Sequence, residues 1–117
     1  MPSEAGESFA FGDVVLLRFP FTNQTASKQR TAVIVSSVEY NQTKPDLVVM
    51  AITSQLRSEA SLGEVWITNW HEANLLKPSA IKPVFATIEQ NLIVKRLGKL
   101  QPTDISMLRV AIGKILC

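Results

Sequence analysis

The chain has 117 residues, which is enough for one domain with a single core and too few for two. Its hydrophobic content of 46% and charged content of 19% are those of an ordinary globular domain, and no apolar run reaches the ~20 residues of a membrane-spanning helix. The single cysteine, Cys117, excludes an internal disulfide, and a chain with one histidine and one cysteine cannot form a His/Cys metal cluster by itself. The sequence also does not start like a signal peptide, so we expect a cytoplasmic protein. Because the carboxylates are scattered along the chain as well, we expect a protein that uses no metal and no cofactor.

Charge is distributed unevenly along the chain. The net charge is +2, but Glu4 and Glu7 lie near the start, so eight of the ten acidic residues face all twelve lysines and arginines from Phe11 onward. This balance permits a basic groove for nucleic acid, and a mildly basic surface without such a groove is the alternative.

Residues 1–10 are predicted to be a flexible tail, followed by one domain at residues 11–117.

Two apolar, β-branched stretches, residues 13–19 and 31–37, flank a polar loop at residues 20–30. Valine, isoleucine and threonine suit a half-buried pleated surface, so we predict an opening pair of strands. Pro20 ends the first strand, because it lacks the N–H that a central strand needs. Arg30 stands where the loop re-enters the sheet, and its five N–H donors suit an anionic ligand, above all a phosphate.

The middle of the chain alternates polar loops with short strands. Residues 38–45 are polar and predict a turn, and residues 56–63 predict a surface loop. Residues 46–53 are nearly all apolar, which is typical of a strand buried on both faces, and they end in polar side chains. Residues 64–68 predict a further short strand with Trp66 as its core anchor.

A short helix is predicted near residues 69–76. Asn69 is a favourable N-cap, and Glu72 three residues later completes the pattern of a capping box. Pro78 then ends the helix, because proline cannot continue the hydrogen-bond pattern.

The last part of the chain predicts two strands and the only long helix. Residues 79–88 indicate an extended segment interrupted by Pro83, and residues 92–97 indicate another strand. The helix begins at Pro102, and apolar residues at helical spacing predict the face that packs on the sheet: Ile105, Leu108, Ile112 and Ile115. Several short strands followed by one helix predict an α+β, mainly β, domain built on a small antiparallel sheet.

Several short motifs occur in a particular order: Gly-Asp-Val-Val from Gly12, Phe-Pro-Phe-Thr at 19–22, Lys-Gln-Arg at 28–30, MAITSQ at 50–55, NWHEANLLKPS at 69–79 and Leu-Gly-Lys-Leu at 97–100. Together they resemble the MazF/PemK toxin family, which comprises small endoribonucleases of bacterial toxin–antitoxin pairs. The resemblance covers residues 11–116. The family usually has proline after the arginine, whereas this chain has Thr31, a difference expected to alter local stiffness more than chemistry.

The resemblance implies a fold, an activity and partners. The implied fold is an SH3-like small antiparallel β-barrel with a C-terminal helix, assembled as a homodimer that creates an RNA-binding groove. The implied activity is sequence-specific cleavage of single-stranded RNA, including mRNA, without a metal ion. The substrate's own 2′-OH would attack, leaving a 2′,3′-cyclic phosphate and a 5′-OH. A cognate antitoxin would hold the enzyme inactive.

Two residues are the catalytic candidates. The resemblance places Arg30 at the family's catalytic arginine, where its guanidinium would hold two phosphate oxygens; the alternative is a surface arginine paired with an acid. It aligns Thr53 with the family's active-site threonine, whose hydroxyl would donate to a phosphate oxygen or orient the 2′-OH; the alternative is a hydroxyl that satisfies the backbone at a strand end. The further candidates for RNA contact are Phe19, Phe21, Thr22, Lys28, Ser54, Gln55, Lys77 and Ser79.

Residues 69–71 carry weaker signals. An acidic residue often precedes the tryptophan in one branch of the family, but here Asn69 stands there, so no acid role is carried over. Trp70 is predicted to lie in the core rather than to stack on a base. His71 is the only side chain that titrates near neutral pH, but it matches no family motif, and we predict an exposed histidine without a catalytic role.

Two other functional classes remain open at this point. Toxins of the same fold bind and trap DNA gyrase without hydrolysing anything, and such a toxin has no need of the Arg30 and Thr53 pair. A plain SH3-like interaction module is the third possibility, but eight aromatic residues in all make an aromatic ligand groove a weaker hypothesis.

Overall fold

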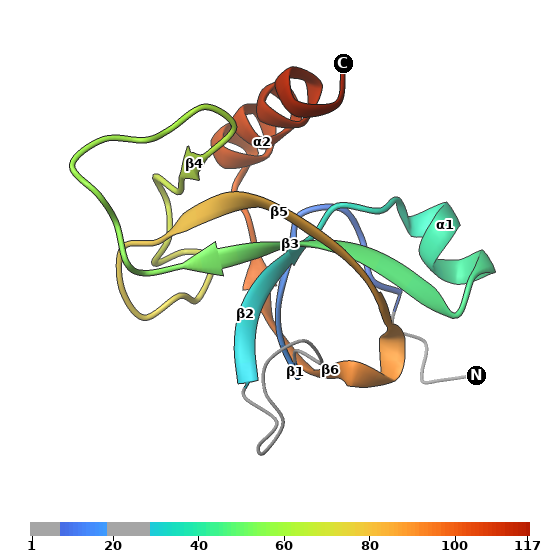
Figure 1. Ribbon diagram of the computed structural model, residues 1–117. Coiled ribbons are helices and arrows are strands. Elements are labelled where there is room, and N and C mark those ends of the chain that lie inside the picture. Colours follow the sequence, from blue (N-terminus) through green and yellow to red (C-terminus); the bar gives the residue numbers. More distant parts are fainter. Residues whose placement is uncertain (1–7, 19–28) are drawn as a thin grey trace.

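The computed structural model of the protein describes residues 8–18 and 29–117 (Figure 1). In chain order these residues form β1 (Asp13–Arg18), β2 (Gln29–Ile34), α1 (Val38–Thr43), β3 (Asp46–Thr53), β4 (Val65–Trp66), β5 (Ala80–Glu89), the 3-10 helix η1 (Gln90–Leu92), β6 (Ile93–Lys99) and α2 (Pro102–Leu116). The predicted mainly β fold with a C-terminal helix is confirmed. None of these helices has the length and hydropathy of a membrane span.

The strands form one antiparallel sheet in the order β4-β5-β3-β2-β1-β6. The short helix η1 connects β5 directly to β6, although the two strands are separated in the sheet by β3, β2 and β1. The sheet therefore curls back on itself as a small barrel, which is visible as the strong curvature of β5 and β2 in Figure 1.

Successive residues of β1 face two different cores, because side chains alternate along a strand. Val14 packs between the sheet and α2, whereas Val15 and Leu17 pack inside the barrel. Strand β3 has the predicted bounds and contributes to both cores, with Met50 in the first and Leu47 in the second. The prediction of a strand buried on both faces is confirmed.

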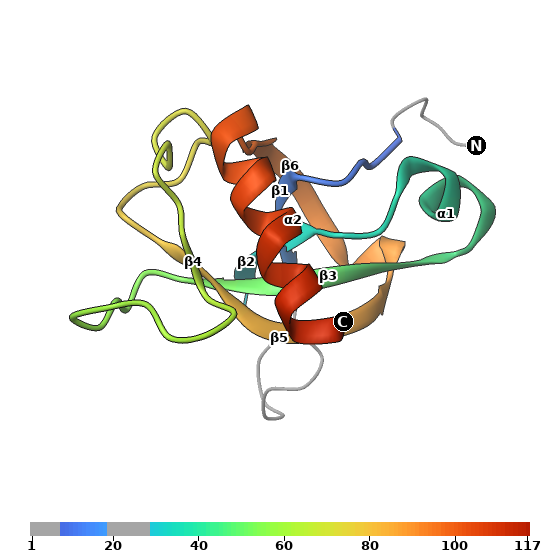
Figure 2. The same cartoon turned by 90° about the horizontal axis from the view of Figure 1, so that it is seen from above.

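Helix α2 lies across one face of the sheet (Figure 2). Leu108 and Ala111 are buried against the sheet, and the other three apolar residues predicted for this face, Ile105, Ile112 and Ile115, pack partly buried beside them. The helical spacing in the sequence therefore identified the packed face.

The polar turn predicted at residues 38–45 was wrong, because residues 38–43 form helix α1. Ser37 caps the helix, and its hydroxyl accepts the backbone N–H of Tyr40 at 3.1 Å. Asn41 is buried, and its side-chain amide donates to the carbonyl of Phe9 at 2.8 Å. The polar side chains of this stretch thus serve a cap and a tertiary contact rather than a turn.

The short helix predicted near residues 69–76 was also wrong, since residues 68–74 form a series of turns. The expected capping box is replaced by a long-range contact. The carboxylate of Asp104 in α2 accepts the backbone N–H groups of Thr68 and Asn69, both at 2.9 Å. The backbone N–H of Asn69, which a capping box would pair with the side chain of Glu72, therefore donates to a carboxylate 35 positions away.

Strand β4 is shorter than the predicted strand at residues 64–68 and comprises two residues. The side chains of Val65 and Ile67, on either side of Trp66 in the sequence, are buried in the core. Trp66 is only half-buried. The prediction of Trp66 as the anchor of this strand was wrong, because the pleat turns its side chain to the less covered face.

Pro83 lies inside β5 without ending it. The β3–β5 register shifts between Met50 and Ile52, opposite the part of β5 that contains the proline. A proline has no N–H to pair, so an irregularity in the ladder is where it is tolerated.

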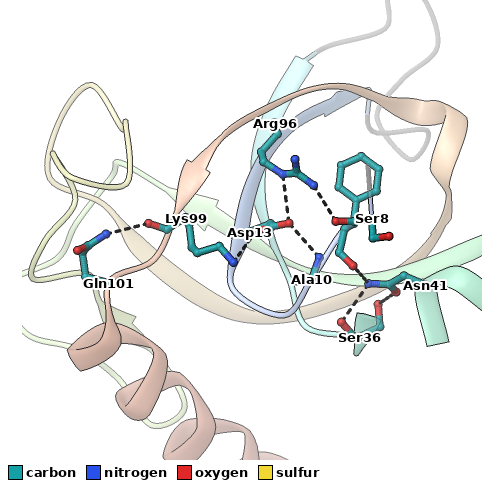
Figure 3. A network of polar contacts seen from close by, with 9 residues as sticks. Ser8, Ala10, Asp13, Ser36, Asn41, Arg96, Lys99 and Gln101 are labelled. Atoms are coloured by element: carbon teal, nitrogen blue, oxygen red, sulfur yellow. Dashed lines mark hydrogen bonds and ion pairs between the residues drawn. The ribbon is translucent and has the colours of Figure 1, made fainter. Parts of the chain in front are cut away.

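A polar network holds the start of β1 (Figure 3). The buried carboxylate of Asp13 contacts Arg96 at 3.2 Å and Lys99 at 3.4 Å, and it accepts the backbone N–H of Ala10 at 2.9 Å. Arg96 also donates to the carbonyl of Ser8 at 3.0 Å. Residues 8–10, which the sequence placed in the tail, are thus bound to the domain.

Candidate functional site

A groove of about 630 Å³ opens where β2 and β3 approach the loop before β5. Its walls combine strand ends, the turn after β3 and the segment that leads into β5. The lining residues are Leu16, Gln29, Arg30, Thr31, Ala51, Ile52, Thr53, Ser54, Gln55, Leu75, Leu76, Lys77, Ser79, Lys82 and Val84. All six sequence candidates that lie within the described residues belong to this set.

The pairing of β2 with β3 brings Arg30 and Thr53 to one place. Ala32 pairs with Ala51, and Arg30 and Thr53 each stand two residues beyond this pair along their antiparallel strands. Two residues are one period of a strand, so both side chains leave the sheet on the same face. The structure therefore joins residues that are 23 positions apart in the sequence.

Arg30 is exposed at the groove. Within residues 8–18 and 29–117 no carboxylate forms an ion pair with it, so the alternative of a surface arginine paired with an acid is not seen there. A guanidinium in this position can present its planar set of donors to a ligand in the groove.

Thr53 ends β3 in a local hydrogen bond. Its hydroxyl oxygen accepts the backbone N–H of Gln55 at 3.1 Å, so the structural alternative considered for this residue does occur. The bond uses the oxygen as acceptor and leaves the hydroxyl hydrogen to donate elsewhere. Thr53 can therefore be fixed by the turn and still serve as a donor in the groove.

Positive charge dominates the lining. Three side chains that line the groove are cationic, Arg30, Lys77 and Lys82, and none of the lining residues in the described chain is acidic. Lys82 was missed in the sequence, because Pro83 obscured the strand pattern around it. Only the position of β5 beside β3 shows that Lys82 reaches the same groove as Arg30.

The remaining candidates differ in how accessible they are. Ser54, Gln55 and Lys77 are exposed, whereas Ser79 is buried and its hydroxyl donates to the carbonyl of Lys77 at 2.8 Å. Ser79 is thus engaged in shaping the wall that carries Lys77. The candidates Phe19, Phe21, Thr22 and Lys28 lie outside the described residues.

The residues with weaker signals lie away from the groove. Trp70 is partly buried against the core that faces α2, in agreement with its predicted role. His71 is exposed, its ring stands edge-on to Trp70 with 5.9 Å between ring centroids, and it does not line the groove. Among the described residues, no three His, Cys, Asp or Glu side chains are placed to hold a metal ion.

Several solved structures share this architecture. A crystal structure of MazE–MazF from Deinococcus radiodurans matches with a TM-score of 0.74 and 19% identity, covering 94% of this chain and 97% of that chain. The Mycobacterium tuberculosis toxin MazF-mt6 matches with a TM-score of 0.68 and 20% identity, covering 86% and 92%. A mycobacterial endoribonuclease in complex with its cognate antitoxin matches with a TM-score of 0.72 and 15% identity, covering 93% of each chain. At these identities the likeness establishes a shared fold.

Sequence comparison establishes the family. A search of curated proteins found no significant match. The profile of a PemK-like, MazF-like toxin of type II toxin-antitoxin systems, however, matches residues 10–116, which is nearly the whole chain. The chain therefore belongs to the PemK-like, MazF-like family of type II toxin–antitoxin toxins.

Proposed function

We propose that the protein is a sequence-specific, metal-independent endoribonuclease toxin that cleaves single-stranded RNA, including mRNA, and is neutralised by a cognate antitoxin. The observation that carries this proposal is the groove, which among residues 8–18 and 29–117 is lined by three cationic and no acidic side chains and has an arginine and a threonine on adjacent strands. Such a lining attracts a polyanion, and the paired side chains supply donors for one phosphate group. Structures of relatives that are themselves named endoribonucleases support the same reading.

In the proposed reaction the substrate supplies its own nucleophile. The 2′ oxygen forms a bond to phosphorus while the bond from phosphorus to the 5′ oxygen breaks. The 2′-OH loses its proton, the 5′ oxygen gains one, and the products carry a 2′,3′-cyclic phosphate and a 5′-OH. Arg30 holds two phosphate oxygens and opposes their developing charge, and Thr53 donates its hydroxyl hydrogen to a phosphate oxygen or orients the 2′-OH.

The direct test is to incubate the purified protein with a long single-stranded RNA and to map the product ends. The proposal expects cuts at one short sequence, with cyclic phosphate ends. A gyrase-binding toxin or a non-catalytic interaction module would leave the RNA intact. Intact RNA at micromolar protein, with the protein folded and antitoxin removed, would refute the proposed activity.

We also propose that the toxin acts as a homodimer. Helix α2 presents several large apolar side chains to solvent, among them Met107, Val110 and Leu116. Exposed apolar groups that cluster on one helix are commonly covered by a partner. Light scattering of the purified toxin at micromolar concentration is expected to give twice the 12.9 kDa mass of the chain, and the mass of a single chain would contradict this assembly.

His71→Ala is expected to cleave RNA within about twofold of the wild-type rate. The side chain is exposed outside the groove, and substitutions at such positions usually have small effects. The check is the single-turnover rate on an RNA that contains the mapped site. Loss of cleavage in a folded His71→Ala protein would identify His71 as the general base and contradict the prediction that it has no catalytic role.

A further inference from the structure

One wall of the groove is an irregular segment, residues 68–79, that alternates between core and groove. Leu75 is buried in the core that faces α2, with 6% of its surface exposed. Leu76, the next residue, is 95% exposed and lines the groove together with Lys77. A single exposed leucine is ordinary on a protein surface, but this one lines a cationic groove and stands directly beside a lysine of the same wall.

Contacts from outside the groove hold this segment in place. At its start, the fully buried carboxylate of Asp104 in α2 accepts the N–H groups of Thr68 and Asn69, both at 2.9 Å. Further along, the side-chain amide of Asn74 donates to the carbonyl of Leu97 in β6 at 2.7 Å. The position of Leu76 is therefore set by two elements, α2 and β6, that do not line the groove.

The backbone near Asn74 is adapted to this close approach. Asn74 has a φ of 66°, in the left-handed region that asparagine tolerates better than most residues. Opposite it, Gly98 of β6 leaves room for the segment, because a Cβ on Gly98 would lie 2.5 Å from the carbonyl oxygen of Ala73. Both features keep Ala73 and Asn74 against β6, and Leu76 follows two residues after this anchored point.

We propose that residues 68–79 are a specificity element, in which Lys77 binds a backbone phosphate and Leu76 contacts the face of the base beside the cleaved bond. Asn74 and Asp104 act as positioning residues that fix where this base contact is made. The proposal rests on the proposed endoribonuclease function. It adds a base-contacting side chain that is apolar and therefore reads shape and stacking surface rather than hydrogen-bond donors.

The chemistry of the wall fits a nucleotide. A single-stranded nucleotide presents an anionic phosphate and a flat base face, and protein grooves for single strands combine cations with side chains, most often aromatic, that pack on the base faces. Here a leucine would supply that packing surface. Lys77 and Leu76 are adjacent in sequence and line the same groove as Arg30 and Thr53. The groove thus holds one wall for the reacting phosphate and another for a neighbouring nucleotide.

The test uses a set of oligonucleotides that carry the mapped cut site with each base in turn at every flanking position. Leu76→Ser is expected to raise KM roughly three- to tenfold and to change kcat little. The reason is that serine covers less apolar surface against the base than leucine does. The substitution is also expected to relax the base preference at one flanking position. The matched control is Leu62→Ser, since Leu62 is 80% exposed on another loop and does not line the groove.

Asn74→Gly tests the positioning role. Glycine accepts the φ of 66° but cannot donate to the carbonyl of Leu97, so the segment loses one tether without backbone strain. The expected result is a higher KM and relaxed preference at the same flanking position that Leu76→Ser affects, with an unchanged thermal midpoint. Leu76→Met, which keeps an apolar side chain of similar volume, is expected to retain both the wild-type KM and the preference.

The outcomes separate this inference from the function on which it rests. If the wild-type protein cuts no RNA, the proposed function fails. If the wild-type protein cuts RNA but Leu76→Ser and Asn74→Gly behave like Leu62→Ser in KM and base preference, the specificity element is refuted while the function stands. If Leu76→Ser leaves RNA kinetics unchanged and weakens antitoxin binding instead, the segment is a protein-binding surface and the inference is overturned.

Discussion

Replacing Arg30 by lysine is expected to lower the rate of RNA cleavage about 100- to 1000-fold, the loss found when a preorganised donor to a developing anion is removed. The substitution keeps the positive charge and loses the planar pair of N–H donors that holds two phosphate oxygens. Arg30 is exposed and forms no ion pair with any carboxylate of the described residues, so the change is not expected to disturb folding.

The measurement is single-turnover cleavage of an oligonucleotide with the mapped site, together with a thermal unfolding curve for each variant. Arg57→Lys is the matched control, because Arg57 is also exposed but lies on a loop that does not line the groove. Thr53→Ala should reduce cleavage in the same assay by roughly 10- to 100-fold, since one hydrogen bond to a charged group is lost. An Arg30→Lys protein that cleaves like the Arg57→Lys control would show that charge alone suffices and that the two-oxygen contact is not used.

Much of this fold could be predicted because its elements have strong local patterns. Strand β3 is an apolar run closed by polar residues, and its predicted bounds, residues 46–53, agree with the structure. The packed face of α2 followed from apolar residues at helical spacing. In both elements the burial requirement repeats over enough residues for the period to be unambiguous.

The elements that could not be predicted depend on contacts between distant parts of the chain. Residues 68–74 have the local features of a capped helix, but the N–H groups of Thr68 and Asn69 bind Asp104, some 35 positions later. Residues 38–43 look like a polar turn, yet the buried Asn41 bonds to Phe9, 32 positions earlier. No local pattern contains the partner, so propensity alone favoured the wrong structure.

The residues of the candidate site could also be predicted only in part from the sequence. Arg30 and Thr53 were proposed from motifs, and their roles remain predictions, but the β2–β3 register shows that both lie at one groove. Lys82 and Leu76 reach this groove only because β5 and residues 68–79 are folded against it. Those two residues stand in sequence contexts, beside Pro83 and inside a presumed helix, that concealed their exposure.

A second large loss of cleavage is expected from a change in the substrate rather than in the protein. If the 2′-OH is the nucleophile, replacing the one nucleotide 5′ to the cleaved phosphate by its 2′-deoxy form removes the attacking oxygen and should abolish cutting. Binding should be nearly unchanged, because the phosphate that Arg30 holds and the neighbouring base are retained. The modified strand is therefore expected to inhibit cleavage of the unmodified strand competitively.

The nucleophile is identified by cleavage of two oligonucleotides that differ only in that oxygen, with the product ends determined by mass spectrometry. Complete cutting of the ribose strand to a 2′,3′-cyclic phosphate and a 5′-OH is expected. The deoxy strand is expected to remain uncut and still to compete for the groove. Cutting at the deoxy position, or a 5′-phosphate on the product, would mean that water is the nucleophile, and the assignment of Arg30 and Thr53 to a transesterification site would be contradicted.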